Sequence, residues 1–262
     1  MILFSFDIEE FDMPLEYGRT ISFDDQIKIS IEGTAVILDL LQKHQIKATF
    51  FSTVVFAENA PNIIGRIVSE GHEIASHSYY HSDFKVEHLR ESKEKLEEIT
   101  NTKVIGYRMP RMQPVDENEI FKAGYIYNSS LNPTYLPGRY NNFSKPRTYF
   151  KQEGVWQIPA SVSPIVRFPL FWLSFHNLPL WFYKILCKST IKKDKYLNLY
   201  FHPWEFTDLK DAERFNFPSY VSKNSGKDMK DRFEKLIVWM KEQNHSFHST
   251  RDLIERIEAK SI

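Results

Sequence analysis

The stretch of sequence that decides the fold of this chain is Gly71-His72-Glu73-Ile74-Ala75-Ser76-His77-Ser78-Tyr79-Tyr80-His81. It begins as a short buried strand, so His77 stands at the strand's carboxyl end and His81 follows on the turn that leads away. Two imidazoles at this spacing can point to one side, which is how many proteins present two nitrogen ligands to one metal ion. The chain holds nine histidines, so a chance pairing is equally compatible with this stretch alone. The rest of the sequence decides between the two readings.

Strand and helix patterns alternate along the chain. The strands are expected at 2–7, 47–54, 72–76, 103–107, 125–128, 155–158, 196–202 and 246–248. The helices are expected near 28–44, 62–70, 84–99, 116–123, 178–188, 227–243 and 250–260. Repeated strand–helix units imply a parallel sheet, and this many units imply a closed or nearly closed barrel. The sequence therefore predicts an α/β fold: a single deformed (β/α) barrel of about seven parallel strands, with residues 1–262 forming one domain.

Composition limits the classes of function. Lys plus Arg equals Asp plus Glu at 34 each, so no net field favours nucleic acid or an acidic membrane. Aromatic residues make up 15%, which suits a large core and also a groove that stacks on sugar rings. The single cysteine, Cys187, excludes an intramolecular disulfide and fits a reducing compartment. No basic leader precedes the strand at 2–7, so we expect a cytoplasmic protein.

The apolar segment 165–187 approaches the ~20 residues that a membrane span needs. It is interrupted by charged and polar residues and by prolines, namely Arg167, Pro169, His176, Asn177, Pro179 and Lys184. We therefore expect no transmembrane segment but a buried loop and helix, with an interfacial membrane anchor as the alternative. Its aromatic part, 168–182, is also a candidate contact surface, although the sequence does not give the oligomeric state.

Polar side chains follow several of the predicted strands. In such a barrel the functional groups lie at the carboxyl ends of the strands. The first strand ends in Asp7-Ile8-Glu9-Glu10, and alternation places Asp7 and Glu9 on one face. Another strand leads to Arg108, and a late apolar strand ends in His202-Pro203-Trp204-Glu205. With the two histidines of the opening stretch, one barrel mouth would hold carboxylates, imidazoles and a guanidinium group.

These motifs resemble those of the NodB-homology polysaccharide deacetylases, metal-dependent enzymes that remove N-acetyl groups from sugars. The first family motif, Thr-Phe-Asp-Asp, corresponds to Ser-Phe-Asp-Ile-Glu at 5–9. His-Ser/Thr-x-x-His corresponds to 77–81, Arg-x-Pro to 108–110, and the strand ending in His leads to His202. The resemblance is closest to a bacterial branch found with exopolysaccharide synthesis, whose members carry Asp-x-Glu and His-Pro-Trp-Glu at these strands.

The resemblance implies one divalent cation bound by His77 and His81. Zinc is the expected ion, and cobalt, nickel or manganese would also suit nitrogen and oxygen ligands. The family's second carboxylate is replaced here by Ile8. We assign the third ligand to Glu9, which shares a face with the predicted base, and keep Glu10 as the alternative.

The resemblance also implies the acid–base groups. Asp7 would be the general base, and Arg108 would orient it and hold its pKa low. His202 would be the general acid, and the backbone N–H of Arg111 would help to stabilise the oxyanion. Relatives often carry an aspartate at the position of Asn128 that would support the protonated acid. Residues expected to contact the saccharide are Tyr79, Pro110, Arg111 and Trp204.

Three further polar residues, Glu205, Asp12 and His176, have no role that the resemblance assigns. Glu205 could replace the missing aspartate as the partner of the acid. Asp12 is expected to order its loop, and His176 matches no motif and is expected to be an ordinary surface or core residue.

We therefore expect metal-dependent hydrolysis of an N-acetyl amide on a saccharide. One alternative is hydrolysis of another non-peptide C–N bond, such as that of a cyclic amide or a ureide. The other is a degenerate member that binds saccharide without cleaving it. An open aromatic trough would favour a polymer as the substrate, whereas a closed pocket would favour a small molecule.

Overall fold

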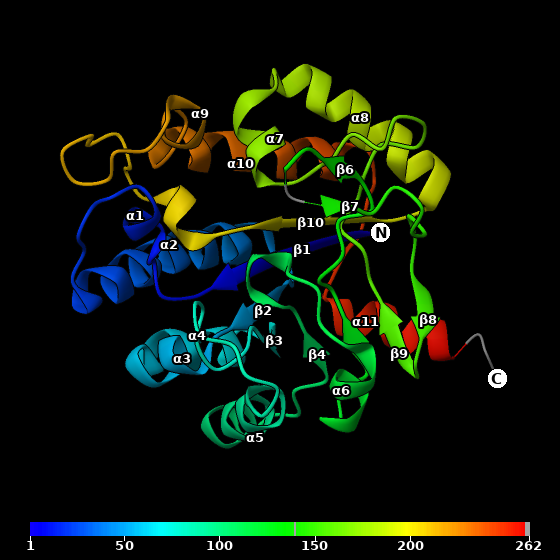
Figure 1. The fold of residues 1–262 in the computed structure, drawn as a ribbon. Coiled ribbons are helices and arrows are strands. Elements are labelled where there is room, and N and C mark those ends of the chain that lie inside the picture. Colours follow the sequence, from blue (N-terminus) through cyan, green and yellow to red (C-terminus); the bar gives the residue numbers. More distant parts are fainter. Residues whose placement is uncertain (139, 260–262) are drawn as a thin grey trace.

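The computed structural model describes residues 1–138 and 140–259 (Figure 1). Its main sheet consists of β1 (Ile2–Ile8), β2 (Thr49–Ser52), β3 (Glu73–Ser76), β4 (Gly106–Tyr107), β5 (Tyr127–Asn128), β8 (Phe150–Gln152), β9 (Val155–Gln157), β10 (Leu197–Phe201) and β11 (Phe247–His248). The order is β10-β1-β2-β3-β4-β5-β9-β8, and β11 also pairs with β1. Only β8 runs antiparallel to its neighbour among these described strands. A separate antiparallel pair is formed by β6 (Tyr135–Leu136) and β7 (Tyr140–Asn141).

Helices surround the curled sheet (Figure 1). They are α1 (Met13–Glu16), α2 (Phe23–His44), α3 (Val54–Asn59), α4 (Pro61–Ser69), α5 (His88–Thr100), α6 (Glu117–Lys122), α7 (Trp172–Asn177), α8 (Leu180–Asp194), α9 (Ser219–Ser222), α10 (Lys227–Glu242) and α11 (Thr250–Glu258). Two short 3-10 turns complete the list, η1 (Pro110–Met112) and η2 (Pro203–Phe206).

The predicted (β/α) barrel is confirmed. The strands β10, β1, β2, β3, β4, β5 and β9 run parallel along one curled sheet, and the short β11 pairs with β1 as an eighth parallel strand. Every predicted strand and helix occurs with shifted bounds, and the predicted last helix position, 260, lies outside the described residues. The pattern missed α1, α3, α7 and α9 and the strands β6, β7 and β8, because such short elements do not complete a readable hydrophobic period.

An irregular segment, residues 158–161, connects β10 at one end of the strand order with strands near the other end. The backbone N–H of Ile158 donates to the carbonyl of Asn128 (2.8 Å), and that of Ser161 donates to the carbonyl of Asn198 (2.9 Å). Since Asn128 ends β5 and Asn198 lies in β10, residues 158–161 bridge two strands that do not pair directly. This bridge holds the two sides of the barrel together.

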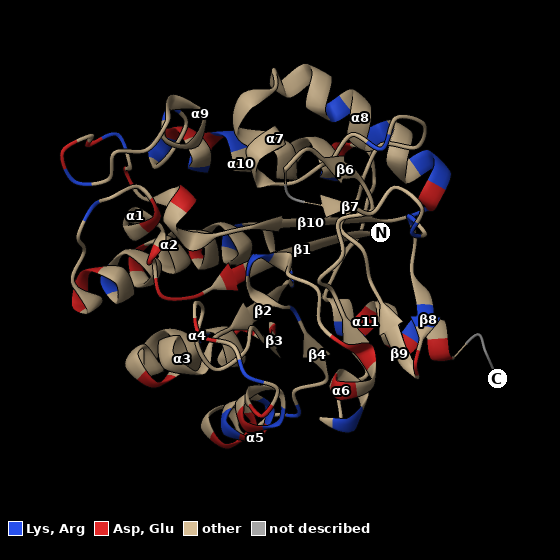
Figure 2. Ribbon diagram, in the orientation of Figure 1, with Lys and Arg blue, Asp and Glu red and all other residues tan. Residues whose placement is uncertain are grey.

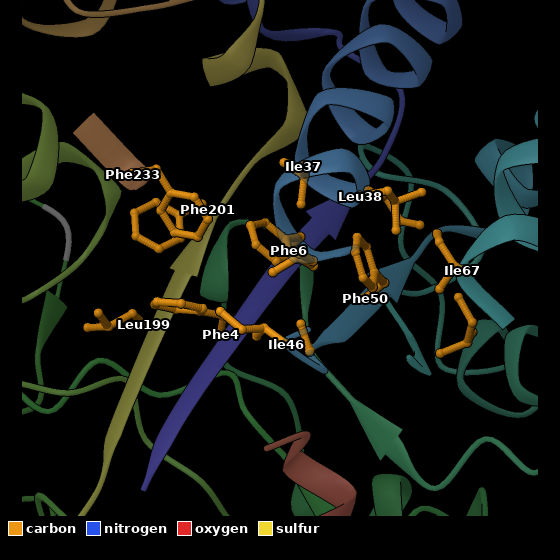
Figure 3. Packing of buried hydrophobic residues seen from close by; sticks show 14 of the residues in the cluster. Phe4, Phe6, Ile37, Leu38, Ile46, Phe50, Ile67, Leu199, Phe201 and Phe233 are labelled. Carbon is orange, nitrogen blue, oxygen red and sulfur yellow. The ribbon is translucent and has the colours of Figure 1, made fainter. Parts of the chain in front are cut away.

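The hydrophobic core lies between the sheet and the helices and explains the alternation of β1. Phe4 and Phe6 point toward the helices (Figure 3). The ring centroid of Phe4 lies 4.9 Å from that of Phe233 in α10, and the ring centroid of Phe6 lies 5.1 Å from that of Phe50 in β2. Burying one such side chain contributes about 1.5–3 kcal/mol. Because side chains alternate along a strand, Asp7 is directed to the barrel interior instead.

The apolar segment 165–187 forms a loop and helices but is not buried throughout. No helix in the described part of the chain is long and apolar enough to cross a membrane. Phe175 and Tyr183 are fully buried, as expected. The predicted burial is wrong for Ile165 and Val166, which are exposed in the loop before α7. It is also wrong for Trp181, which is exposed because α8 packs against the protein through one face only.

Gly33 in α2 is required by close packing against η2, the turn that follows His202. A Cβ atom at this position would lie 1.9 Å from the carbonyl oxygen of Pro203. We expect Gly33→Ala to lower the free energy of unfolding by about 1–3 kcal/mol, as overpacking does. Urea denaturation measures this change.

Gly65→Ala in α4 is the matched control, because no heavy atom lies within 4 Å of its added Cβ. Helix propensity alone should then stabilise the protein by up to about 1 kcal/mol. Equal effects of the two substitutions would contradict the packing argument.

Candidate active site

The carboxyl ends of β1, β3 and β10 open into one cavity of about 340 Å³. Residues that line it include Asp7, Glu9, His77, His81, Arg111, Phe171, Trp172, Tyr200, His202 and Trp204. The structure therefore brings together side chains from distant parts of the sequence that were assigned to one site.

Strand alternation at β1 places the two acidic side chains as expected. Asp7 is the residue before the last in β1, and its side chain faces the cavity. The side chain of Ile8, the last residue, is fully buried in the hydrophobic core. Glu9 follows the strand directly and lines the same cavity as Asp7. The apolar residue that replaces the family's second carboxylate thus serves packing.

Glu9, His77 and His81 each bring one ligand atom within 4.8 Å of the others. The Nε2 atoms of His77 and His81 lie 3.0 Å and 3.2 Å from the same carboxylate oxygen, Oε2 of Glu9. The Nδ1–H of His77 donates to the carbonyl of Arg108 (2.9 Å), and that of His81 donates to Oδ1 of Asp12 (2.8 Å). These bonds direct both Nε2 atoms to the cluster. Two imidazoles and one carboxylate fit zinc and similar divalent ions.

The charges of this cluster are tightly coupled. Burial raises the pKa of Glu9, but the charge of His81 and the hydrogen bond from His77 outweigh it, so the pKa falls to about 2. Burial lowers the pKa of His81, but Glu9 and Asp12 outweigh it and raise the pKa to about 9. Without a metal ion, His81 is therefore protonated at neutral pH and must release a proton when it binds one.

Glu10 lies apart from the cluster. Its Oε2 accepts a hydrogen bond from Oγ1 of Thr53 at 2.5 Å, and burial raises its pKa. The structure thus places Glu9, and not Glu10, beside the two histidines.

Arg108 is fully buried and is held by hydrogen bonds on all sides of its guanidinium group. Its Nη1 donates to Oδ1 of Asp7 at 2.6 Å. Its Nη2 donates to the hydroxyls of Ser5 (3.0 Å) and Ser129 (2.9 Å), and its Nε donates to the carbonyl of Ser129 (3.1 Å). With Oδ1 of Asp7 engaged, Oδ2 lies 3.9 Å from Nε2 of His202.

His202 stands between an aromatic ring and a buried carboxylate. It stacks on Trp204 with ring centroids 4.7 Å apart, and its Nδ1–H donates to Oε1 of Glu205 at 3.0 Å. The other oxygen of Glu205 accepts from Nε2 of His176 at 2.9 Å. Burial lowers the pKa of His202, but the bond to Glu205 and the nearby carboxylate charges outweigh it, and the net pKa is raised.

Asn128 has other partners. Its Nδ2 donates to Oε1 of Gln157 (3.1 Å), and its Oδ1 accepts from the backbone N–H of Ser130 (3.1 Å). The carboxylate beside His202 is therefore that of Glu205, the partner left open by the sequence.

Two of the four expected saccharide contacts lie outside the lining of this cavity. Arg111 and Trp204 line the cavity, but Tyr79 and Pro110 are absent from the lining formed by the described residues. The carbonyls of Ser78 and Tyr79 accept hydrogen bonds from the first residues of α3, and the ring of Tyr79 lies in a separate depression. Pro110 is buried at the start of η1.

Sequence reasoning missed the roles of Asp12 and His176. Asp12 follows the strand-end motif closely, so its acidic side chain near a predicted metal ligand was a usable signal. His176 had no such signal, because its contact with Glu205 spans 29 residues and involves no local pattern.

Comparison with known proteins agrees with this geometry. Residues 19–117 match the model of the polysaccharide deacetylase family. The match covers less than half of the chain, so it shows a similarity of this region to the family. The matched region contains His77, His81 and Arg108, whereas Asp7 and His202 lie outside it.

Proteins similar to part of this chain include the peptidoglycan-N-acetylglucosamine deacetylase of Bacillus cereus. Our chain is 41% identical to it over 97 residues, which are 36% of this chain and 34% of that protein. The chain thus spans about a third of the length of this relative.

Solved structures share the fold over nearly the whole chain. The probable polysaccharide deacetylase of Pseudomonas aeruginosa PAO1 has a TM-score of 0.67 at 14% identity, over 97% of this chain and 89% of that one. The allantoinase Puue has a TM-score of 0.67 at 18% identity, over 98% and 90%. At such identities the similarity shows the fold alone.

Glu205→Gln tests the carboxylate behind His202. Loss of this charge should lower the pKa of His202, which an NMR titration of the histidine ring nitrogens measures directly. The pKa of His202 is higher in the folded than in the unfolded protein, where it is about 6.5. The contact between His202 and Glu205 therefore stabilises the fold fully at a pH below about 6.5. This stabilisation is lost as the pH rises through the pKa of His202 in the folded protein.

The control is Glu119→Gln, which removes a half-buried carboxylate paired with Lys122 on α6. It should leave the pKa of His202 unchanged. An unchanged pKa in Glu205→Gln as well would contradict the role of this carboxylate.

Proposed function

We propose that the protein hydrolyses the N-acetyl amide of a saccharide with one divalent cation held by Glu9, His77 and His81. The observation that carries this proposal is the shared cavity. It combines a donor set for a metal ion with a carboxylate and an imidazole whose Oδ2 and Nε2 atoms lie 3.9 Å apart. Amide hydrolysis needs such a set, because the carbonyl is a poor electrophile and the amine a poor leaving group.

The residues divide the work of proton transfer. A bound cation would polarise the acetyl carbonyl and lower the pKa of a bound water. Asp7 is held by Arg108 through Oδ1, so its Oδ2 is available to take a proton from the attacking water. His202, whose protonated form Glu205 favours, is placed to give a proton to the departing nitrogen.

Aromatic side chains support a saccharide as the substrate. Phe171, Trp172, Tyr200 and Trp204 line the cavity beside His202. The rings of Trp172 and His202 pack edge to face, with their centroids 5.6 Å apart. Such rings offer apolar faces for stacking on a sugar. Arg111 also lines the cavity, where its Nε donates to Glu16 (3.0 Å) and its Nη2 donates to Ser82 (3.0 Å).

Asp7→Asn tests the proposal. The purified protein is analysed for bound metal, and acetate release is followed from a panel of N-acetylated saccharides. The variant should lose acetate release by at least about 100-fold, since general-base catalysis is worth this much, while its metal content stays that of the wild type.

The control is Asp116→Asn, because Asp116 is an exposed residue that caps α6 and does not line the cavity. Wild-type rates in Asp7→Asn would refute the assignment of the base. Bound metal with no acetate from any saccharide, but turnover of a cyclic amide or ureide, would instead support the alternative reaction. Saccharide binding without metal or turnover would support the degenerate form.

A further inference from the structure

Residues 140–200 differ from the rest of the chain in charge. They contain two acidic residues, Glu153 and Asp194, against nine basic ones: Lys145, Arg147, Lys151, Arg167, Lys184, Lys188, Lys192, Lys193 and Lys195. The whole chain is balanced at 34 of each sign, so this positive charge is offset elsewhere. Figure 2 shows basic positions along α8, on the outside of the molecule.

The exposed face of α8 is apolar in its first half. The helix buries one stripe, formed by Tyr183, Cys187, Thr190 and Ile191. On the opposite side of the helix, Trp181 is 66% exposed and Ile185 is 54% exposed. Lys188, which is also exposed, follows them on this side. A surface helix normally carries polar residues on that face, so these apolar side chains need a partner that the folded chain does not supply.

The preceding loop packs on the other side of this helix. Oγ1 of Thr190 donates to the carbonyl of Val162 (3.5 Å) and the hydroxyl of Tyr183 donates to that of Leu170 (3.1 Å), and both helix residues belong to the buried stripe. We therefore define the α8 surface by the exposed face of the helix alone: Trp181, Phe182, Ile185, Lys188 and Lys192.

We propose that the α8 surface binds an anionic lipid bilayer. Tryptophan, phenylalanine and isoleucine side chains enter the boundary between head groups and acyl chains, and adjacent lysines pair with the negative surface. A second copy of this chain is a poorer partner, because two surfaces of the same positive charge would repel each other. The charge thus selects a bilayer over self-association.

The position of α8 gives this contact a use. α7 carries Trp172 into the cavity, and only residues 178–179 separate α7 from α8. A bilayer on the α8 surface would hold the cavity near saccharides that are carried on lipid. This last step rests on the proposed function, whereas bilayer binding itself does not, so the two can fail separately.

Vesicle sedimentation tests the binding with the full chain. The wild type should sediment with vesicles of phosphatidylcholine and phosphatidylglycerol, much less with phosphatidylcholine alone, and less at high salt. The double variant W181S/I185S should bind the anionic vesicles at least about tenfold more weakly, since its apolar contacts are lost. K188E/K192E should lose the preference for anionic lipid.

The matched control is V86S/F121S, which removes two exposed apolar side chains outside the α8 surface and should bind like the wild type. Unchanged thermal unfolding shows that each variant is folded. A wild type that binds neither kind of vesicle would overturn the proposal, as would a W181S/I185S variant that binds like the wild type. Concentration-dependent dimers in analytical ultracentrifugation that W181S/I185S abolishes, without vesicle binding, would assign the surface to self-association instead.

Discussion

The buried ion pair between Arg108 and Asp7 is the interaction on which the rest of the site depends. A guanidinium group without solvent contact is tolerated only when its N–H groups are satisfied, and here Asp7, Ser5 and Ser129 satisfy them. The ring of Phe51 also lies 4.0 Å from its Cζ. Since these partners come from β1, β2 and the end of β5, the pair ties the barrel mouth together. Removing one charge would leave the other buried, at a cost of about 3–5 kcal/mol.

One hydrogen bond from Nδ1 orients each of three imidazole rings in the site. His77 donates through Nδ1 to the backbone carbonyl of Arg108, while His81 and His202 donate to Asp12 and Glu205. Each ring is thereby held with Nε2 available to the cavity. Two of these Nε2 atoms meet Glu9, and the third faces Asp7. The proposed roles of metal ligand and acid–base group therefore differ in the position of the ring, because the three rings are held in the same way.

The sequence was sufficient where local periodicity carries the information. Alternation along β1 separates Asp7 and Glu9 from Ile8, and the strand-end positions of the histidines follow from the order of elements. Contacts between residues far apart in the sequence could not be predicted from such local patterns. The pairing of Glu205 with His176 depends on how α7 packs, and the exposure of Trp181 depends on which face of α8 meets the core. The expected cytoplasmic location stays a prediction.

The central claim is that Glu9 completes a metal site with the two histidines. Calorimetric titration of zinc into Glu9→Gln and Glu10→Gln tests it most directly, because both residues are buried glutamates next to each other in sequence and differ in their contacts. The account predicts that Glu9→Gln weakens zinc binding at least about tenfold, whereas Glu10→Gln keeps the wild-type affinity. Loss of affinity in Glu10→Gln together with wild-type binding in Glu9→Gln would contradict it.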